Sequence, residues 1–292
     1  MKGTFGHPPS WSATEALDGA RRRGSIPTPP AHDRDDPGTP SVRRISVYDL
    51  RDALWKGVED FGACRTDVIA LCLFYPVTGA LLTWIAFDRD LVPLFFPLIS
   101  GFALIGPVAG IGLYEMSRMR EKGEAPNWGH AFLVVKSPSF LAVAVLGLLL
   151  GSVFAVWLLA AHGIYHVTLG PEPPASFGAL FRDVFTTRAG WAMLILGCGV
   201  GLIFAALVLA SSVISFPLLL DHDVGLPVAV ITSLCVARAN PRPIALWGLI
   251  VTAGLAIGSI PLFLGLIVVL PILGHATWHL YRRAVKLERR AG

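Results

Sequence analysis

The sequence predicts an all-α, polytopic membrane protein: a transmembrane bundle of six helices, arranged as three hairpins that are each preceded by an amphipathic helix. Hydrophobic residues make up 54% of the 292-residue chain and charged residues only 15%, whereas soluble domains carry about 25% charged residues. The uncharged residues gather in five long runs, and each run is at least as long as the roughly 20 helical residues that cross a bilayer core. These runs are 68–87, 91–114, 138–164, 190–220 and 244–274.

Six membrane helices are expected within an integral membrane domain over 43–286. They lie near 67–87, 91–115, 139–164, 190–220, 244–259 and 262–281. The last two share one apolar stretch, which as a single helix would be about 57 Å long at 1.5 Å per residue. Because Gly258 to Pro261 offers a turn, we divide the stretch there. One long kinked helix is the alternative, and it would place the C-terminus on the opposite side of the membrane.

An amphipathic segment precedes each pair of membrane helices. In the first, Ser46 and Asp49 predict a capping box, and apolar residues follow at helical spacing on one face, at Val47, Leu50, Leu54, Val58 and Phe61. The second segment covers 126–137 and the third 225–239, and a proline follows each of them. Another apolar stripe over 177–185 predicts a surface helix between the third and fourth membrane helices.

The two ends of the chain are polar, and the cations predict which side they occupy. Residues 1–42 contain seven prolines and predict a disordered cytoplasmic tail, while 287–292 form a basic C-terminal end. From Arg43 onward, the six-helix arrangement places sixteen Lys and Arg residues on the side of the two termini and three on the other side. This bias predicts cytoplasmic N- and C-termini. It also accounts for the net charge of +4 without a nucleic-acid partner.

Ionisable groups near the inner ends of the membrane helices are the candidate site, because such groups are costly inside a membrane unless they are paired. They are Glu115, Asp221, His222, His275 and His279. If the hairpins pack around a common axis, these side chains converge, and carboxylates with imidazoles bind a metal or relay a proton. The simpler interpretation is that each group marks a helix end at the headgroup region. His162 and His166 lie near the outer end of the third helix, too far away to join them.

No catalytic motif accompanies these residues. The four cysteines stand far apart without a CxxC pair, so they predict neither a disulfide framework nor a zinc site. The leading hypothesis is therefore a non-enzymatic scaffold or accessory subunit with no cofactor, whose partners are the lipid bilayer and other membrane proteins. A small-solute or ion transporter that uses the polar cluster is the alternative. A metal- or haem-binding membrane protein associated with respiration is the third hypothesis.

Several segments resemble a bacterial family of integral membrane proteins known as domain of unknown function 2189. They include 49–54, 112–118, 215–221, 240–241, 245–251 and 274–283, the last reading Gly-His-Ala-Thr-Trp-His-Leu-Tyr-Arg-Arg. The resemblance extends from about Val42 to Lys286. It implies a multi-pass protein of the bacterial inner membrane and no assigned activity. Some members carry the label of a putative cytochrome c oxidase, for which this sequence offers no set of ligands.

Overall fold

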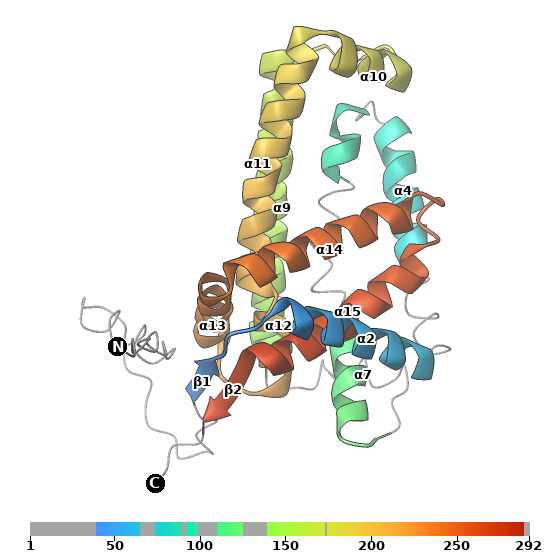
Figure 1. Ribbon diagram of the computed structural model, residues 1–292. Coiled ribbons are helices and arrows are strands. Elements are labelled where there is room, and N and C mark those ends of the chain that lie inside the picture. Colours follow the sequence, from blue (N-terminus) through green and yellow to red (C-terminus); the bar gives the residue numbers. More distant parts are fainter. Residues whose placement is uncertain are drawn as a thin grey trace, which may run out of the picture.

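The protein is described by a computed structural model, in which helices dominate (Figure 1). The structure describes residues 39–64, 74–88, 92–98, 110–124, 139–172 and 174–288. It consists of a long helical hairpin that stands on a base of shorter, more buried helices (Figure 1).

The hairpin is formed by α9 (Phe140–Thr168) and α11 (Arg188–Ser212), which run side by side and are joined by α10 (Phe177–Thr186). Beyond α11 the chain continues into α12 (Ser215–Asp221). Helices are thus found where the third and fourth membrane helices and the helix between them were predicted. Ser176 and Thr187 each accept a hydrogen bond from the first turn of the helix that follows, and such caps fix the two corners of the connection.

Among the residues that the structure describes, three helices are long and apolar enough to cross a membrane: Phe140–Thr168, Arg188–Asp221 and Pro241–Ser259. The six-helix arrangement is not confirmed. Within the first two predicted membrane helices the structure describes α4 (Phe74–Asp88), the short 3₁₀ helix η1 (Val92–Leu94) and the first residues of α7 (Ile111–Glu121). Other parts of those two predicted helices, and the second amphipathic segment at 126–137, lie outside the described residues.

The last apolar stretch forms two helices, as predicted, and not one kinked helix. These are α14 (Pro241–Ser259) and α15 (Leu266–Ala284), and the turn between them places Leu262 and Phe263 at positive φ angles of 52° and 65°. α14 runs across the lower part of the hairpin (Figure 1).

α15, although predicted as a membrane helix, is not among the three candidate spans. It packs against other helices of the base, where 11 of its 19 residues are buried. The apolar residues that suggested a lipid-facing helix are thus used in protein packing.

The amphipathic helix α2 (Val47–Ala63) begins at the predicted capping box of Ser46 and Asp49. The face that it buries differs from the predicted one. It presents Leu50, Ala53, Gly57 and Asp60 to the protein, while Val47 and Val58 are exposed. Small residues determine which face of α2 packs against α15, because the two helices approach closely there: a Cβ atom added at Gly57 would lie 2.6 Å from the carbonyl oxygen of Ile272 in α15.

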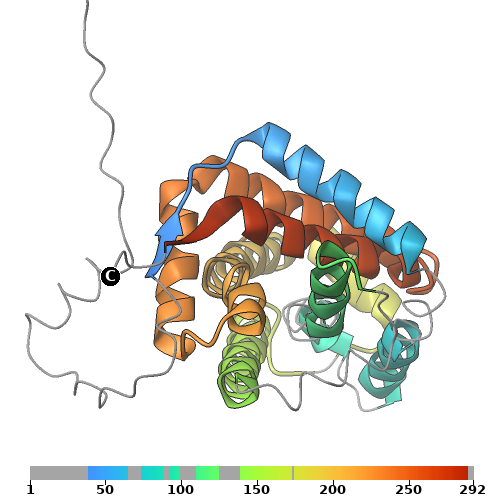
Figure 2. The same cartoon turned by 90° about the horizontal axis from the view of Figure 1, so that it is seen from below.

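A short antiparallel ribbon joins the two ends of the described domain. β1 (Thr39–Val42) pairs with β2 (Val285–Glu288), with Val42 opposite Val285. β1 lies within the segment predicted as a disordered tail, so the ordered domain begins earlier than the sequence suggested. Seen from below, α2 lies beside α15 at the rim of the base (Figure 2).

The third segment predicted to be amphipathic forms the helix α13 (Leu226–Ala239), which is apolar and is linked by hydrogen bonds to the residues before α2. The side chain of Asn240 accepts a hydrogen bond from the backbone of Ile45 at 2.8 Å and donates one to the carbonyl of Arg43 at 3.0 Å. The amide side chain thereby satisfies backbone groups on a segment almost 200 residues away in the chain.

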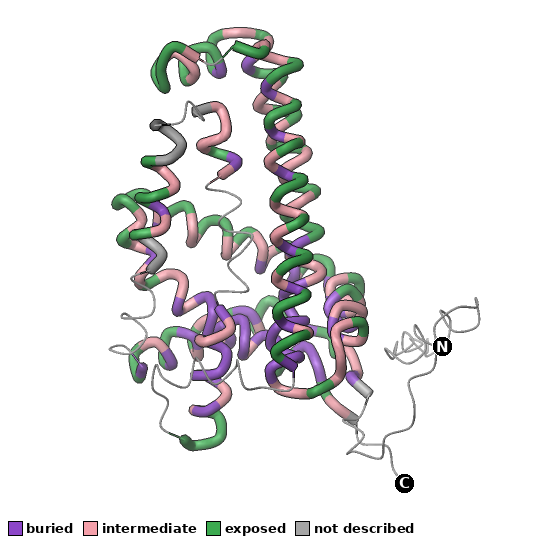
Figure 3. The backbone as a smooth tube through the Cα atoms, turned by 180° about the vertical axis from the view of Figure 1, so that it is seen from behind, coloured by how far each residue is buried: buried purple, intermediate pink, exposed green. Residues whose placement is uncertain are grey.

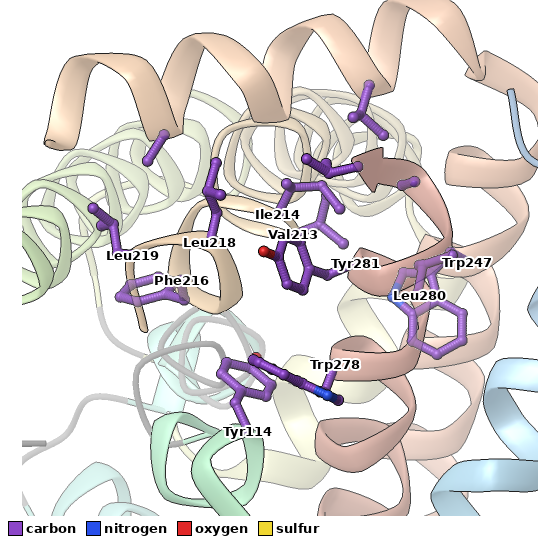
Figure 4. Packing of buried hydrophobic residues seen from close by; sticks show 14 of the residues in the cluster. Tyr114, Val213, Ile214, Phe216, Leu218, Leu219, Trp247, Trp278, Leu280 and Tyr281 are labelled. Atoms are coloured by element: carbon purple, nitrogen blue, oxygen red, sulfur yellow. The ribbon is translucent and has the colours of Figure 1, made fainter. Parts of the chain in front are cut away.

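The hydrophobic core lies at the foot of the hairpin, where buried residues concentrate, whereas the hairpin itself is mostly exposed or half-buried (Figure 3). Phe216 and Leu218 of α12 belong to the same buried cluster as Trp278 and Tyr281 of α15, and in Figure 4 Trp278 lies beside Tyr114 of α7. The rings of Trp278 and Tyr281 stand 5.4 Å apart in a tilted pair, a geometry that aromatic side chains favour.

Replacing Gly57 with alanine should weaken the contact between α2 and α15. The new methyl group would overlap the backbone of α15, and overpacking of this kind costs roughly 1–3 kcal/mol. Thermal unfolding in detergent should show a lower midpoint for Gly57→Ala. Gly62→Ala is the matched control, because nothing lies within 4 Å of a Cβ atom at this position on the same helix. Equal midpoints for the two variants would contradict the close approach.

Candidate functional site

The carboxylate of Asp60 is buried between three helices, with 6% of the residue exposed. Its Oδ2 accepts hydrogen bonds from Ser117 Oγ of α7 at 2.6 Å and from His279 Nε2 of α15 at 2.9 Å. Arg120 of α7 forms an ion pair with Oδ1. Both oxygens of the carboxylate are therefore occupied by donors from elements that lie far from it in the sequence.

His275 completes the group, which we name the Asp60 cluster: Asp60, Ser117, Arg120, His275 and His279. The Nδ1 atom of His275 lies 2.7 Å from Ser117 Oγ. Because the hydroxyl proton of Ser117 is donated to Asp60, its oxygen accepts a hydrogen from Nδ1, which leaves Nε2 of the neutral ring unprotonated. This Nε2 atom is buried and has no hydrogen-bond partner in the part of the chain that the structure describes.

The environment fixes the charges of the cluster. Burial raises the pKa of Asp60, but the hydrogen bonds from His279 and Ser117 and the nearby imidazoles outweigh it, so that the pKa lies below its ordinary value of 3.8. Burial lowers the pKa of His275 to about 4, against the attraction of Asp60. At neutral pH, Asp60 is thus ionised beside a neutral His275.

A second group surrounds Asp221 at the end of α12. Its Oδ2 accepts a hydrogen bond from the hydroxyl of Tyr281 at 2.9 Å and lies 3.1 Å from Nε2 of His222. Arg282 reaches the same oxygen at 3.4 Å and also binds Glu121 of α7 at 3.0 Å. This Asp221 cluster links α7, α12 and α15 on the other side of the base.

Glu115 belongs to neither group. It pairs with Arg118 at 2.9 Å, and Arg118 donates to the carbonyl of Leu220 at 3.0 Å. At helical spacing, Glu115 lies on a different face of α7 from Ser117 and Arg120. The other oxygen of Glu115, Oε2, is buried without a hydrogen-bond partner among the described residues.

The predicted site residues therefore lie in one region, the base, but around three different centres. His275 and His279 meet at Asp60, while Asp221 and His222 meet each other, and Glu115 stands apart. The ring centroids of His162 and His166 lie 4.4 Å apart in an edge-to-face arrangement near the other end of α9, away from these groups.

Sequence reasoning missed Asp60, Ser117 and Arg120. The signal for Asp60 was present in its spacing, since Ala53, Gly57 and Asp60 recur at intervals of four and three residues on one face of α2. A carboxylate on the same helix face as two small residues indicates that the charged group is buried where another helix packs closely against that face. Ser117 and Arg120 have no comparable signal, because only the position of α7 against α2 gives them a role.

The geometry of the Asp60 cluster suits structural and proton-binding roles. Ser117 bonds to the carboxylate and the imidazole at once and is 1% exposed, so it does not match a nucleophilic serine that faces a substrate. Among the residues that the structure describes, no group of three or more His, Cys, Asp or Glu side chains is arranged to hold a metal ion.

Comparison with known proteins supports the resemblance found in the sequence. The model of the family DUF2189, described as a predicted integral membrane protein, matches residues 95–221. The matched segment includes α7, the hairpin of α9 and α11, and α12. No curated protein and no solved structure matches the chain.

Acid should destabilise the protein through His275. The pKa of His275 is about 4 in the folded chain, against an ordinary value of 6.5. Between these two pH values the imidazole is protonated in the unfolded chain but neutral in the folded chain. Stability therefore falls as the pH is lowered through this window, by up to about 3 kcal/mol. The fall should appear as a lower unfolding midpoint at pH 5 than at pH 7.

In His275→Asn, an amide can still donate to Ser117 but does not titrate, so its midpoint should vary less over the same window. The exposed His166→Asn is the matched control and should retain the full dependence. A wild-type midpoint that is constant between pH 7 and pH 5 would contradict the buried neutral imidazole.

Proposed function

We propose that this chain, whose central segment matches a family of predicted integral membrane proteins, is a non-enzymatic scaffold or accessory subunit of the bacterial cytoplasmic membrane. The observation that carries the proposal is the division of the molecule into an apolar hairpin, exposed along its length, and a base in which the ionisable side chains bind one another.

The outer surface of α11 is suited to contact another membrane helix. Ile195 and Leu202 on one of its faces are 67% and 70% exposed. Between them lies Gly199, where a Cβ atom would meet nothing within 4 Å, and Ala206 continues the same face. Helices associate in lipid through close packing at small residues, because burial of apolar side chains alone gains little there. A transmembrane helix of another protein is the partner that fits this surface.

The orientation proposed here places both ends of the chain in the cytoplasm. The excess of Lys and Arg on the side of the termini supports it, as does the pairing of Thr39–Val42 with Val285–Glu288.

Neither alternative function has a comparable observation in its favour. Transport through a polar cluster requires the five predicted side chains to converge, whereas they surround three centres that are largely satisfied by internal hydrogen bonds. For a metal centre, the described residues offer no group of three or more His, Cys, Asp or Glu side chains.

A photo-crosslinking amino acid at Leu202 tests the proposal. Irradiation of intact membranes should yield a discrete heavier species that contains a second, different membrane protein. Gly199→Leu should reduce the yield of this species, because the leucine side chain would occupy the space beside Gly199 where the partner helix packs. The same probe at Leu148, which is 72% exposed on α9, is the control and should capture lipid. Adducts at Leu202 that contain only lipid or only copies of this chain would contradict a scaffold or accessory role.

A further inference from the structure

The face of α2 that turns away from the base carries apolar and aromatic side chains. Tyr48 and Trp55 are 82% and 65% exposed, and Val47 and Val58 on the same side are also exposed. Together with Arg51, which lies among them, these residues form what we call the outer face of α2. The opposite face is fully used in packing against α15, so the outer face is a second apolar surface on one helix.

The position of α2 in the fold brings this face to the level of the membrane surface. α2 runs across the foot of the hairpin at the height of α12 (Figure 1), and it forms the rim of the base when the molecule is seen from below (Figure 2). With the hairpin crossing the bilayer, α2 lies along the boundary between hydrocarbon and water. Tyrosine and tryptophan are enriched at this boundary because their rings are apolar at one end and polar at the other.

The charges around the outer face favour an anionic partner. Arg43, Arg44 and Arg51 are exposed on or just before the helix. The acidic residues Asp49 and Asp52, by contrast, are turned toward Arg283 of α15, at 3.7 Å and 2.6 Å.

Asp52 also pairs with Lys56 at 3.6 Å. Glu59 is the exposed acid at the flank of the face. On and just before α2, three exposed arginines thus outnumber the one exposed carboxylate.

We infer that α2 is an interfacial helix that binds the headgroups of anionic phospholipids in the surrounding leaflet. Trp55, Val47 and Val58 insert at the level of the first acyl carbons, and the arginines bind phosphate groups. An amphipathic helix with cations beside an apolar stripe binds such surfaces through both contributions. The inference holds for any integral membrane protein with this base, so it does not depend on the proposed association with a partner.

The test uses the full chain with an environment-sensitive fluorescent amino acid at position 55. The protein is reconstituted into vesicles of phosphatidylcholine alone or with 30% phosphatidylglycerol. A blue shift of the emission should appear with phosphatidylglycerol and be lost at high salt, which screens charge. The same probe at Glu124, an exposed residue beyond the end of α7, is the control and should report the same emission in both lipids.

The variant with Arg43→Gln, Arg44→Gln and Arg51→Gln should lose the shift while its unfolding midpoint stays near that of the wild type. If that variant does not fold, the comparison of the two lipid compositions with the wild-type chain still decides the question. Identical emission at position 55 in both lipids would overturn the inference. A shift that follows the ratio of protein to lipid, and not the phosphatidylglycerol content, would also overturn it, because a second copy of the chain would then cover the face.

Discussion

The carboxylate of Asp60 reaches from α2 into a buried space where Ser117 and Arg120 of α7 and His279 of α15 all donate to it. A charge in such a place is tolerated only when its partners are present, since an unpaired buried charge costs several kcal/mol. The stable packing of α2 therefore requires both α7 and α15 in their observed positions. The small residues Ala53 and Gly57 bring the helix close enough for the carboxylate to reach its donors.

The base and the hairpin differ in where their ionisable and apolar side chains lie. The ionisable residues of α7, α12 and α15 meet one another below the hairpin, where Asp221 and Glu121 share Arg282. α9 and α11 expose long apolar side chains along their length, which lipid solvates at no cost. A fixed base that carries such a hairpin can hold the surface of α11 in a constant orientation toward a partner.

The sequence predicted those parts of the fold whose cause is local. Uncharged runs predicted α9, α11 and α14, and Gly258 to Pro261 predicted the turn before α15. The capping box of Ser46 and Asp49 and the apolar stripe of α10 were likewise readable. Composition alone does not distinguish a helix buried in protein from one buried in lipid, so the sequence did not predict how much of α15 is covered by other helices.

The candidate site was only partly predictable because its contacts are long-range. His275 and His279 stood out as imidazoles on one helix face, but their partner Asp60 is 219 residues from His279 in the chain. The convergence predicted for Glu115, Asp221, His222 and the two histidines assumed a common axis. In the structure α7 stands between the groups and directs Glu115 away from Ser117. Strand β1 was missed for the same reason, since its partner lies at the opposite end of the domain.

Hydrogen exchange of an Asp60→Asn variant, followed by mass spectrometry in detergent, tests the role of this carboxylate most directly. Glu59→Gln, at the exposed neighbouring position, is the matched control. The account predicts that Asp60→Asn loses roughly 3–5 kcal/mol of protection in α2 and in the facing part of α7, while the hairpin of α9 and α11 exchanges as before. Protection in α2 and α7 that is the same for both variants would contradict the claim that Asp60 holds the base together.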